Sequence, residues 1–148
     1  MNFELLIVDY ASEYYPQILE LRNHVLRKPL GLNLFDEDLS EDKNQYVVAA
    51  IQNEEILGCL MIKILDKDTV KYRQMAIKNS LQGKGIGTTI LKYADNFCIL
   101  NDYTQVLLHA RKTAKNFYIR NGFEEVGDEF EEVGIPHIVM QKQLSFNQ

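Results

Sequence analysis

This sequence lacks tryptophan, clustered cysteines and long apolar segments. Its 148 residues include no tryptophan, three prolines, and only two cysteines, Cys59 and Cys98. Both cysteines have apolar neighbours and form no C-x-x-C pair or Cys/His cluster, so we expect reduced core thiols and no metal. No apolar run approaches the roughly 20 residues that cross a bilayer. These absences exclude a disulfide-rich secreted domain and predict no membrane partner.

Basic charge is scarce as well. Lysine and arginine number 16 against 21 aspartate and glutamate residues, a net charge of −5. Wide contact with nucleic acid needs clustered basic charge, so we expect no nucleic-acid partner. The first ten residues lack the basic start and cleavage site of a signal peptide, and no stretch resembles a linker. We therefore expect one cytoplasmic domain that spans residues 1–148.

The most informative segment is Gln82-Gly83-Lys84-Gly85-Ile86-Gly87, with three glycines at alternate positions. An extended apolar run, 69–77, precedes it, and residues 88–100 follow with apolar side chains at the spacing of one helix face. The glycines therefore lie at a helix N-terminus. There the first backbone N–H groups lack acceptors and the helix dipole favours an anion. The segment predicts a loop that holds phosphate.

The order of the letters separates this loop from two nucleotide motifs. A dinucleotide fingerprint needs G-x-G-x-x-G, and a Walker A loop needs G-x-x-x-x-G-K-[ST]; neither is present. Gln82, Gly85 and Gly87 instead supply Q-x-x-G-x-G. This pattern resembles the acyl-CoA-binding motif of the GCN5-related N-acetyltransferases (GNAT). By itself it would equally fit a glycine-rich turn that caps a helix.

Later segments extend the resemblance over nearly the whole chain. Asn116-Phe117-Tyr118 and Asn121-Gly122-Phe123 resemble a later family motif, a helix that carries tyrosine and ends in Gly-Phe. Further segments are similar to the ElaA-like branch of the family: Leu21-Arg22, Val25-Leu26-Arg27, Pro29-Leu30-Gly31-Leu32, and the closing stretch 128–137 with Met140. Gly122 also suits the left-handed conformation that ends many helices. We interpret the chain as an N-acetyltransferase of this family.

Periodicity and the resemblance together predict an α/β fold. We expect strands at 3–8, 46–52, 56–65, 69–77, 105–110, 123–125 and 138–143, and helices from Ser12 to about 28, at 88–100 and at 113–121. The polar segment 36–44 is expected to be a loop or short helix. The resemblance implies a mixed, mostly antiparallel sheet flanked by helices and splayed between its fourth and fifth strands. Acyl-CoA would lie in that opening.

The resemblance also implies the cofactor-binding residues and one catalytic residue. Backbone N–H groups of the fourth strand would bond the pantetheine arm, and that of Ile77 would face the thioester oxygen. Tyr118 would protonate the departing CoA thiolate, although it could instead be a packed aromatic residue. The expected acetyl-CoA-binding residues are Met75, Ala76, Ile77, Gln82, Gly83, Lys84, Gly85, Ile86, Gly87, Thr88, Asn116 and Tyr118.

The group that takes a proton from the incoming amine is less clearly marked. His137 is the first candidate, because it follows what reads as a rigid Gly-Ile-Pro turn, although it could simply fix that turn. Glu131, Glu132 and His109 are the alternatives. The acceptor is expected to be a primary amine of a small molecule or peptide. Residues 30–42 and 130–137 are expected to line its pocket.

Two other functions fit the same residues. The chain could bind acyl-CoA as a sensor without turning it over, or use the glycine loop for another phosphate ligand. Release of free thiol from acetyl-CoA would separate an enzyme from a sensor, and binding of ATP or NAD would indicate the second alternative. Edge strands and the C-terminal hairpin could also pair two copies into a homodimer.

Overall fold

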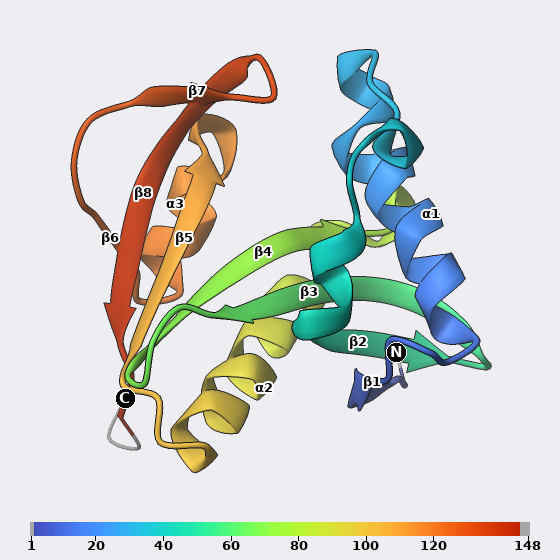
Figure 1. Ribbon diagram of the computed structural model, residues 1–148, viewed down its shortest axis with the longest axis horizontal. Helices are drawn as coiled ribbons and strands as arrows, with labels where there is room; N and C mark the ends of the chain where they lie inside the picture. The colour runs from blue at the N-terminus through green and yellow to red at the C-terminus, as the bar shows by residue number, and fades with distance from the viewer. Residues whose placement is uncertain (1, 146–148) are drawn as a thin grey trace. The chain divides into compact units, whose positions relative to one another are not determined.

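The chain forms a mixed eight-stranded sheet flanked by helices in the computed structural model, which describes residues 2–145 (Figure 1). The hydrogen-bonded strand order is β1-β2-β3-β4-β5-β8-β6, and β7 pairs with β8. The β4–β5 pair is parallel, whereas β1–β2, β2–β3 and the pairs made by β8 are antiparallel. This arrangement confirms the predicted fold class.

The observed elements follow the expected order. The strands are β1 (Glu4–Val8), β2 (Tyr46–Gln52), β3 (Glu55–Ile64), β4 (Thr69–Ile77), β5 (Gln105–Arg111), β6 (Glu124–Glu125), β7 (Phe130–Glu132) and β8 (Ile135–Gln143). The α-helices are α1 (Tyr14–Leu26), α2 (Ile86–Leu100) and α3 (Lys115–Arg120), and the short 3-10 helices are η1 (Lys28–Leu30), η2 (Leu34–Asp36), η3 (Ser40–Asn44), η4 (Asn79–Leu81) and η5 (Lys112–Ala114). No helix within residues 2–145 is long and apolar enough to cross a membrane.

The residues group into two compact units, and each unit is discontinuous in sequence. The first consists of Met1–Lys63 and Gln74–Ala94, and the second of Ile64–Arg73 and Asp95–Gln148. Strand β4 and helix α2 each contribute residues to both units. The boundary within β4 falls at Gln74, whose φ of 57° is unusual for a residue with a side chain.

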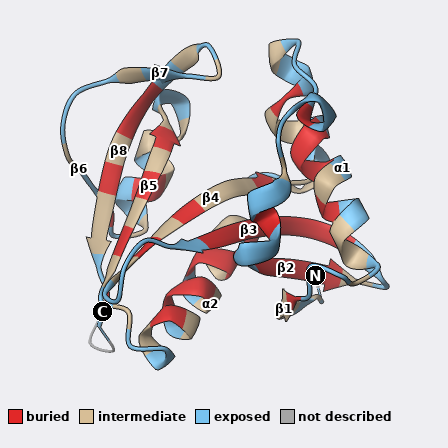
Figure 2. Ribbon diagram, in the orientation of Figure 1, coloured by how far each residue is buried: buried red, intermediate tan, exposed pale blue. Residues whose placement is uncertain are grey.

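Helices α1 and α2 pack on opposite faces of the sheet in the first unit. The neighbouring residues Gly58 and Cys59 of β3 show why, because successive positions of a strand face opposite sides. Cys59 is fully buried in a cluster with Ile18 and Leu21 of α1. On the other face, a Cβ at Gly58 would lie 3.0 Å from the Ile90 side chain of α2. Figure 2 shows the resulting buried residues along β2 and β3.

A buried ion pair fastens the segment that connects α1 to β2. Arg22 of α1 is 1% exposed and donates from Nη1 to Oδ2 of Asp42, at 2.7 Å. The Tyr15 hydroxyl donates to the same oxygen at 2.6 Å. Burial, followed by the hydrogen bond and charge of Asp42, raises the pKa of Tyr15 well above its usual value. Because each buried charge is compensated only by the other, removal of one partner should lower the free energy of unfolding.

In the second unit, β5 lies between β4 and β8. Its parallel pairing with β4 covers 69–72 and 105–108, and its antiparallel pairing with β8 covers its full length, from Gln105 opposite Gln143 to Arg111 opposite His137. Val106, Leu108 and Ala110 alternate as buried residues along β5, as expected for a strand with one face in the core.

A second polar cluster holds α2 to β4 and β8 within this unit. The carboxylate of Asp95 accepts hydrogen bonds from the Tyr72 hydroxyl at 2.7 Å and from Lys142 Nζ at 2.6 Å. Lys142 also donates to the Asn121 carbonyl oxygen at the end of α3, at 2.9 Å. Burial, followed by the charges of Asp95 and Cys98, raises the pKa of Tyr72 well above its usual value. The cluster therefore satisfies polar groups that would otherwise be buried at a cost.

Candidate functional site: a glycine loop at a helix N-terminus

The glycine loop leads directly into α2, as the sequence predicts. Gly85 is the residue before the helix: its carbonyl oxygen accepts the Thr89 N–H at 3.1 Å and the Thr89 hydroxyl at 2.9 Å. Gly83 and Gly85 have φ angles of 80° and 85°, in the region that favours glycine. A Cβ at either position would meet no protein atom within 4 Å. The backbone of the loop is thus open to a ligand.

The helix begins at Ile86, two residues earlier than expected. Its first turn therefore includes more of the residues that were expected to bind acetyl-CoA. Ile86 is buried and anchors the turn, whereas Gln82 to Gly85 are exposed. The N–H groups of Ile86, Gly87 and Thr88 precede the first intrahelical hydrogen bond and can donate outward. A loop of this kind can bind an anion such as a phosphate, and Lys84 adds an exposed positive charge.

Gln82 ties the glycine loop to the end of β4. Its Nε2 donates to the Ile77 carbonyl oxygen at 3.2 Å and to Oδ1 of Asn79 at 3.1 Å. The Lys78 N–H donates to the Leu57 carbonyl oxygen of β3 at 2.9 Å. Because N–H groups alternate along a strand, that of Ile77 points away from β3 and is available to another partner. The side chain of Ile77 packs against β3, where a Cβ at Gly58 would lie 2.7 Å from its Cδ1.

Met75 and Ala76 complete the predicted part of β4. Met75 is half-buried, and Ala76 is 2% exposed within the core cluster of the first unit. By the same alternation, the Met75 N–H points away from β3, as that of Ile77 does, and the Ala76 N–H points toward β3. The structure therefore divides the three predicted backbone donors into two outward-facing groups and one that faces the neighbouring strand.

Tyr118 lies in the second unit, on α3, among aromatic side chains. It is 9% exposed, and its ring meets those of Phe117 and Phe123 edge-on, at 5.1 Å and 5.7 Å between centroids. Burial raises its pKa to about 12, while the charge of Arg111 acts in the opposite direction. Tyr118 is therefore a neutral phenol at ordinary pH, able to donate a proton. Asn116, also predicted, lies exposed on the same helix.

Three of the four candidate bases come together in the second unit. The Glu132 carboxylate lies between two histidines, with Oε1 at 2.9 Å from His109 Nδ1 and Oε2 at 3.8 Å from His137 Nε2. Partial burial favours protonation of Glu132, but the hydrogen bond and charge of His109, with a smaller contribution from His137, outweigh it and lower its pKa. The Phe130 ring packs edge-on against His109. Glu131 is exposed.

The surroundings of His137 differ from the sequence-based expectation. The Gly-Ile-Pro segment is no turn: Ile135, Pro136 and His137 belong to β8, and the turn is made by Val133 and Gly134, both with positive φ. A short strand, β7, pairs with β8 across this turn and was not predicted. His137 is 3% exposed, and its Nδ1 lies 2.9 Å from the Ile135 carbonyl oxygen. His109 is the more exposed of the two histidines.

Sequence reasoning named these histidines and Glu132 but missed their grouping. His109 is on β5, whereas Glu132 and His137 are on either side of a two-residue turn. The pairing of Arg111 with His137 in the β5–β8 register brings the two segments side by side. Only the alternation of residues along β5 could have indicated that His109 faces away from the core, and no spacing in the sequence specifies its partner.

The comparisons with known proteins agree with the fold. Residues 17–144 match the family model described as the acetyltransferase (GNAT) domain. Protein YyaT of Bacillus subtilis is 28% identical over 114 residues, which cover 76% of each chain. The crystal structure of Escherichia coli ElaA has a TM-score of 0.81 at 23% identity, covering 95% of this chain and 99% of that one. A GNAT family acetyltransferase from Elizabethkingia anophelis with acetyl-CoA bound has a TM-score of 0.71 at 19% identity, covering 97% and 99%.

Proposed function

The chain belongs to the acetyltransferase (GNAT) family, and from this membership we propose that it moves an acetyl group from acetyl-CoA to a primary amine of a small molecule or peptide. The neutral amine attacks the thioester carbon, a tetrahedral intermediate forms, and CoA leaves as its thiolate. The two units act together as one catalytic domain in this proposal. A bound acetyl-CoA in the E. anophelis relative supports the choice of donor.

The observation that carries the proposal is the open backbone of the glycine loop. Gly83 and Gly85 adopt positive φ angles with no atom where their side chains would be, directly before the first turn of α2. In the proposal, the N–H groups of Ile86, Gly87 and Thr88 bind the pyrophosphate of acetyl-CoA, and Lys84 adds a charge that approaches from solvent. Each such hydrogen bond is charge-assisted, and hence stronger than one between neutral groups.

The Ile77 N–H serves as the donor to the thioester oxygen. That oxygen gains negative charge as the amine attacks, so a fixed donor lowers the barrier; loss of one comparable donor elsewhere costs about 3 kcal/mol. The hydrogen bond from Gln82 to the Ile77 carbonyl oxygen supports this role, because it fixes the peptide unit that follows Ile77 and leaves the Ile77 N–H, in the preceding peptide unit, available. The Met75 N–H, which faces the same way, binds the pantetheine arm, with Asn116 as a further contact.

Tyr118 is the proton donor to the leaving sulfur. With its pKa at about 12, transfer to a thiolate whose acid has a pKa of about 8.5 is uphill by some 3 to 4 units. The proton therefore moves as the C–S bond breaks, when charge accumulates on sulfur, rather than in advance. The charge of Arg111, which acts to lower the pKa of Tyr118, assists this transfer.

The group that contains His137, Glu132 and His109 takes the proton from the amine. His109 is the member that exchanges the proton with solvent, because its side chain is 30% exposed whereas that of His137 is 4% exposed. Glu132 fixes the ring of His109 through the 2.9 Å contact between Oε1 and Nδ1. His137 holds Glu132 from the other side. In this way the predicted base, His137, acts together with a neighbour that solvent reaches.

The test is the release of free thiol from acetyl-CoA across a panel of amines and peptides. We expect acceptor-dependent release, and a turnover in Tyr118→Phe lower by about 10²-fold, the range of general acid catalysis, with little change in acetyl-CoA affinity. Tyr103→Phe, which removes a hydroxyl elsewhere in the second unit, is the matched control and should behave as the wild type. Tight acetyl-CoA binding without release by any acceptor would instead indicate a sensor.

A further inference from the structure

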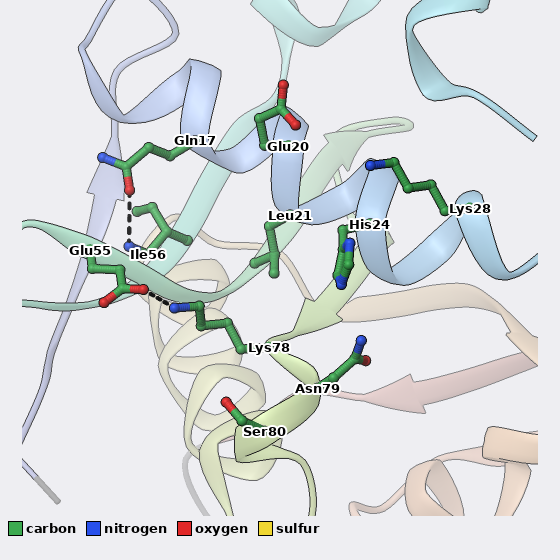
Figure 3. Close-up of a pocket in the computed structure, with 10 residues that line it drawn as sticks. All are labelled: Gln17, Glu20, Leu21, His24, Lys28, Glu55, Ile56, Lys78, Asn79 and Ser80. Carbon is green, nitrogen blue, oxygen red and sulfur yellow. Dashed lines mark hydrogen bonds and ion pairs between the residues drawn. The ribbon is translucent and has the colours of Figure 1, made fainter.

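A cavity of about 540 Å³ lies within the first unit, apart from the glycine loop (Figure 3). One face of α1, the start of β3 and the segment that follows β4 form its walls. Leu21 and Ile56, both buried, give it an apolar floor. Its volume is within the range of small-molecule sites. The lining residues are Gln17, Glu20, Leu21, His24, Lys28, Glu55, Ile56, Lys78, Asn79 and Ser80.

Several of the polar groups around the cavity already have partners. The Gln17 side chain accepts the Ile56 N–H at 3.3 Å and donates to the Glu54 carbonyl oxygen at 3.2 Å. Lys78 forms an ion pair with Glu55, so the two charges largely compensate each other. These contacts fix the wall near the β2–β3 turn. The polar groups that can bind a ligand therefore lie on the opposite wall, near the end of α1.

That opposite wall is rich in hydrogen-bond donors. His24 lies near the end of α1, Lys28 begins η1 just after it, and both line the cavity. In Figure 3 the His24 ring points toward Asn79, whereas the Glu20 carboxylate points away from Asn79 and Ser80. The Asn79 amide offers two N–H groups, and Ser80 offers a hydroxyl.

We propose that this cavity binds a small organic molecule with an oxyanion, either a carboxylate or a phosphate. The oxyanion accepts hydrogen bonds from His24, Lys28 and Asn79, and the carbon skeleton covers Leu21 and Ile56. Lys28 supplies the positive charge for this orientation, because Lys78 is already paired with Glu55, and the Glu20 carboxylate points away from Asn79 (Figure 3). No part of the glycine loop itself lines the cavity.

Asn79 connects the cavity to the glycine loop. Its Oδ1 accepts a hydrogen bond from Gln82, the residue that also holds the Ile77 carbonyl oxygen, while its NH₂ group is left for the cavity. A ligand that fixes the Asn79 amide therefore fixes Gln82 as well. This link rests on the proposed function: occupation of the cavity should tighten acetyl-CoA binding, and acetyl-CoA should tighten binding in the cavity by the same factor.

The binding test uses ¹H–¹⁵N NMR titrations of the full chain with glycerol 3-phosphate, succinate and 1,4-diaminobutane as probes. The two anions are titrated into free protein and into protein saturated with acetyl-CoA, which denies them the glycine loop, whereas the diamine, a possible acetyl acceptor, is titrated into free protein only. We expect saturable shifts at the backbone amides of Gln17, His24 and Asn79 with an anion. His24→Gln and Lys28→Gln should each weaken it at least tenfold, whereas Lys43→Gln, an exposed lysine of the same unit outside the cavity, should not. The better of the two anions identifies carboxylate or phosphate as the preferred group.

Three results would overturn the site: no saturable shift at the cavity residues, equal affinity in Lys28→Gln and wild type, or binding of the diamine in place of the anions. The proposed function is checked separately by calorimetry with acetyl-CoA alone. If acetyl-CoA does not bind, the link to the glycine loop is refuted, but the titrations of free protein still decide the cavity. If both ligands bind, Asn79→Ala should abolish the effect of one on the affinity of the other.

Discussion

Replacement of Gly85 by alanine separates the strain of the glycine loop from its function. Gly85 has a φ of 85° and Gly127, in the second unit, has a φ of 93°. A Cβ at either position meets no atom within 4 Å, so crowding adds nothing to the cost in either case. What remains is the left-handed backbone, which costs an alanine about 1–2 kcal/mol. Gly85→Ala and Gly127→Ala should therefore lower the free energy of unfolding by similar amounts.

The two variants should differ in binding. The open space beside Gly85 faces the proposed phosphate site, and relief of the strain there would rotate the N–H groups of Ile86 and Gly87, which donate to the ligand. We expect the Kd for acetyl-CoA to rise at least tenfold in Gly85→Ala, which corresponds to about 1.4 kcal/mol. Gly127→Ala should keep the wild-type Kd. Urea denaturation gives the first quantity and calorimetry the second.

The comparison can fail in two ways. If Gly85→Ala is destabilised as expected but binds acetyl-CoA as tightly as the wild type, the loop backbone does not bind the pyrophosphate. If both variants lose affinity equally, the loss reflects general destabilisation, and the argument from the position of Gly85 is wrong.

Three further perturbations test other parts of the structure. Asp42→Asn leaves the buried Arg22 guanidinium without its counter-charge, so urea denaturation should show a loss of about 3–5 kcal/mol, partly recovered when Arg22→Met is added; a loss below about 1 kcal/mol would contradict the burial of the pair. In the folded protein the pKa of Glu132 is lowered from 4.5, so its ionised carboxylate stabilises the fold above that pH. The free energy of unfolding of the wild type should therefore exceed that of Glu132→Gln at pH 7, and the difference should shrink toward pH 3. A difference that stays constant with pH would refute the contact with the histidines. Burial raises the pKa of Cys59 to about 12 and of Cys98 to about 11, so a thiol reagent at pH 8 should react slowly with the native protein and rapidly in urea; a rapid native phase would show that a thiol is exposed.

The sequence was sufficient for the elements whose signals are local. The strand 69–77 agrees with β4 residue for residue, because a segment with apolar residues at intervals lies between a polar turn and a glycine loop. The sequence predicts the start of α2 two residues late, because Ile86 and Gly87 read as part of the glycine pattern, although the Gly85 carbonyl oxygen already accepts the first helical hydrogen bond. Helix ends depend on which carbonyl is paired, and composition does not reveal that.

Contacts between distant segments were beyond the sequence. Nothing in the spacing of Arg22 and Asp42 indicates that they form a buried ion pair, or that His24 lines a cavity together with Asn79. The β7 strand was missed because Pro136 reads as a turn residue, whereas proline is tolerated in β8 opposite the short strand β7. Such features follow from the register of the strands, which is a property of the whole fold.

The discontinuous units also set an order in which the protein can form on the ribosome. Every residue of the first unit is present once Ala94 has been synthesised, so its sheet and both of its helix contacts can be complete while the rest of the chain is still being made. Residues 69–73 must wait for their β5 partners, 105–108, and β5 in turn waits for β8. The first unit, with its glycine loop, is therefore encoded entirely by residues that precede Tyr118.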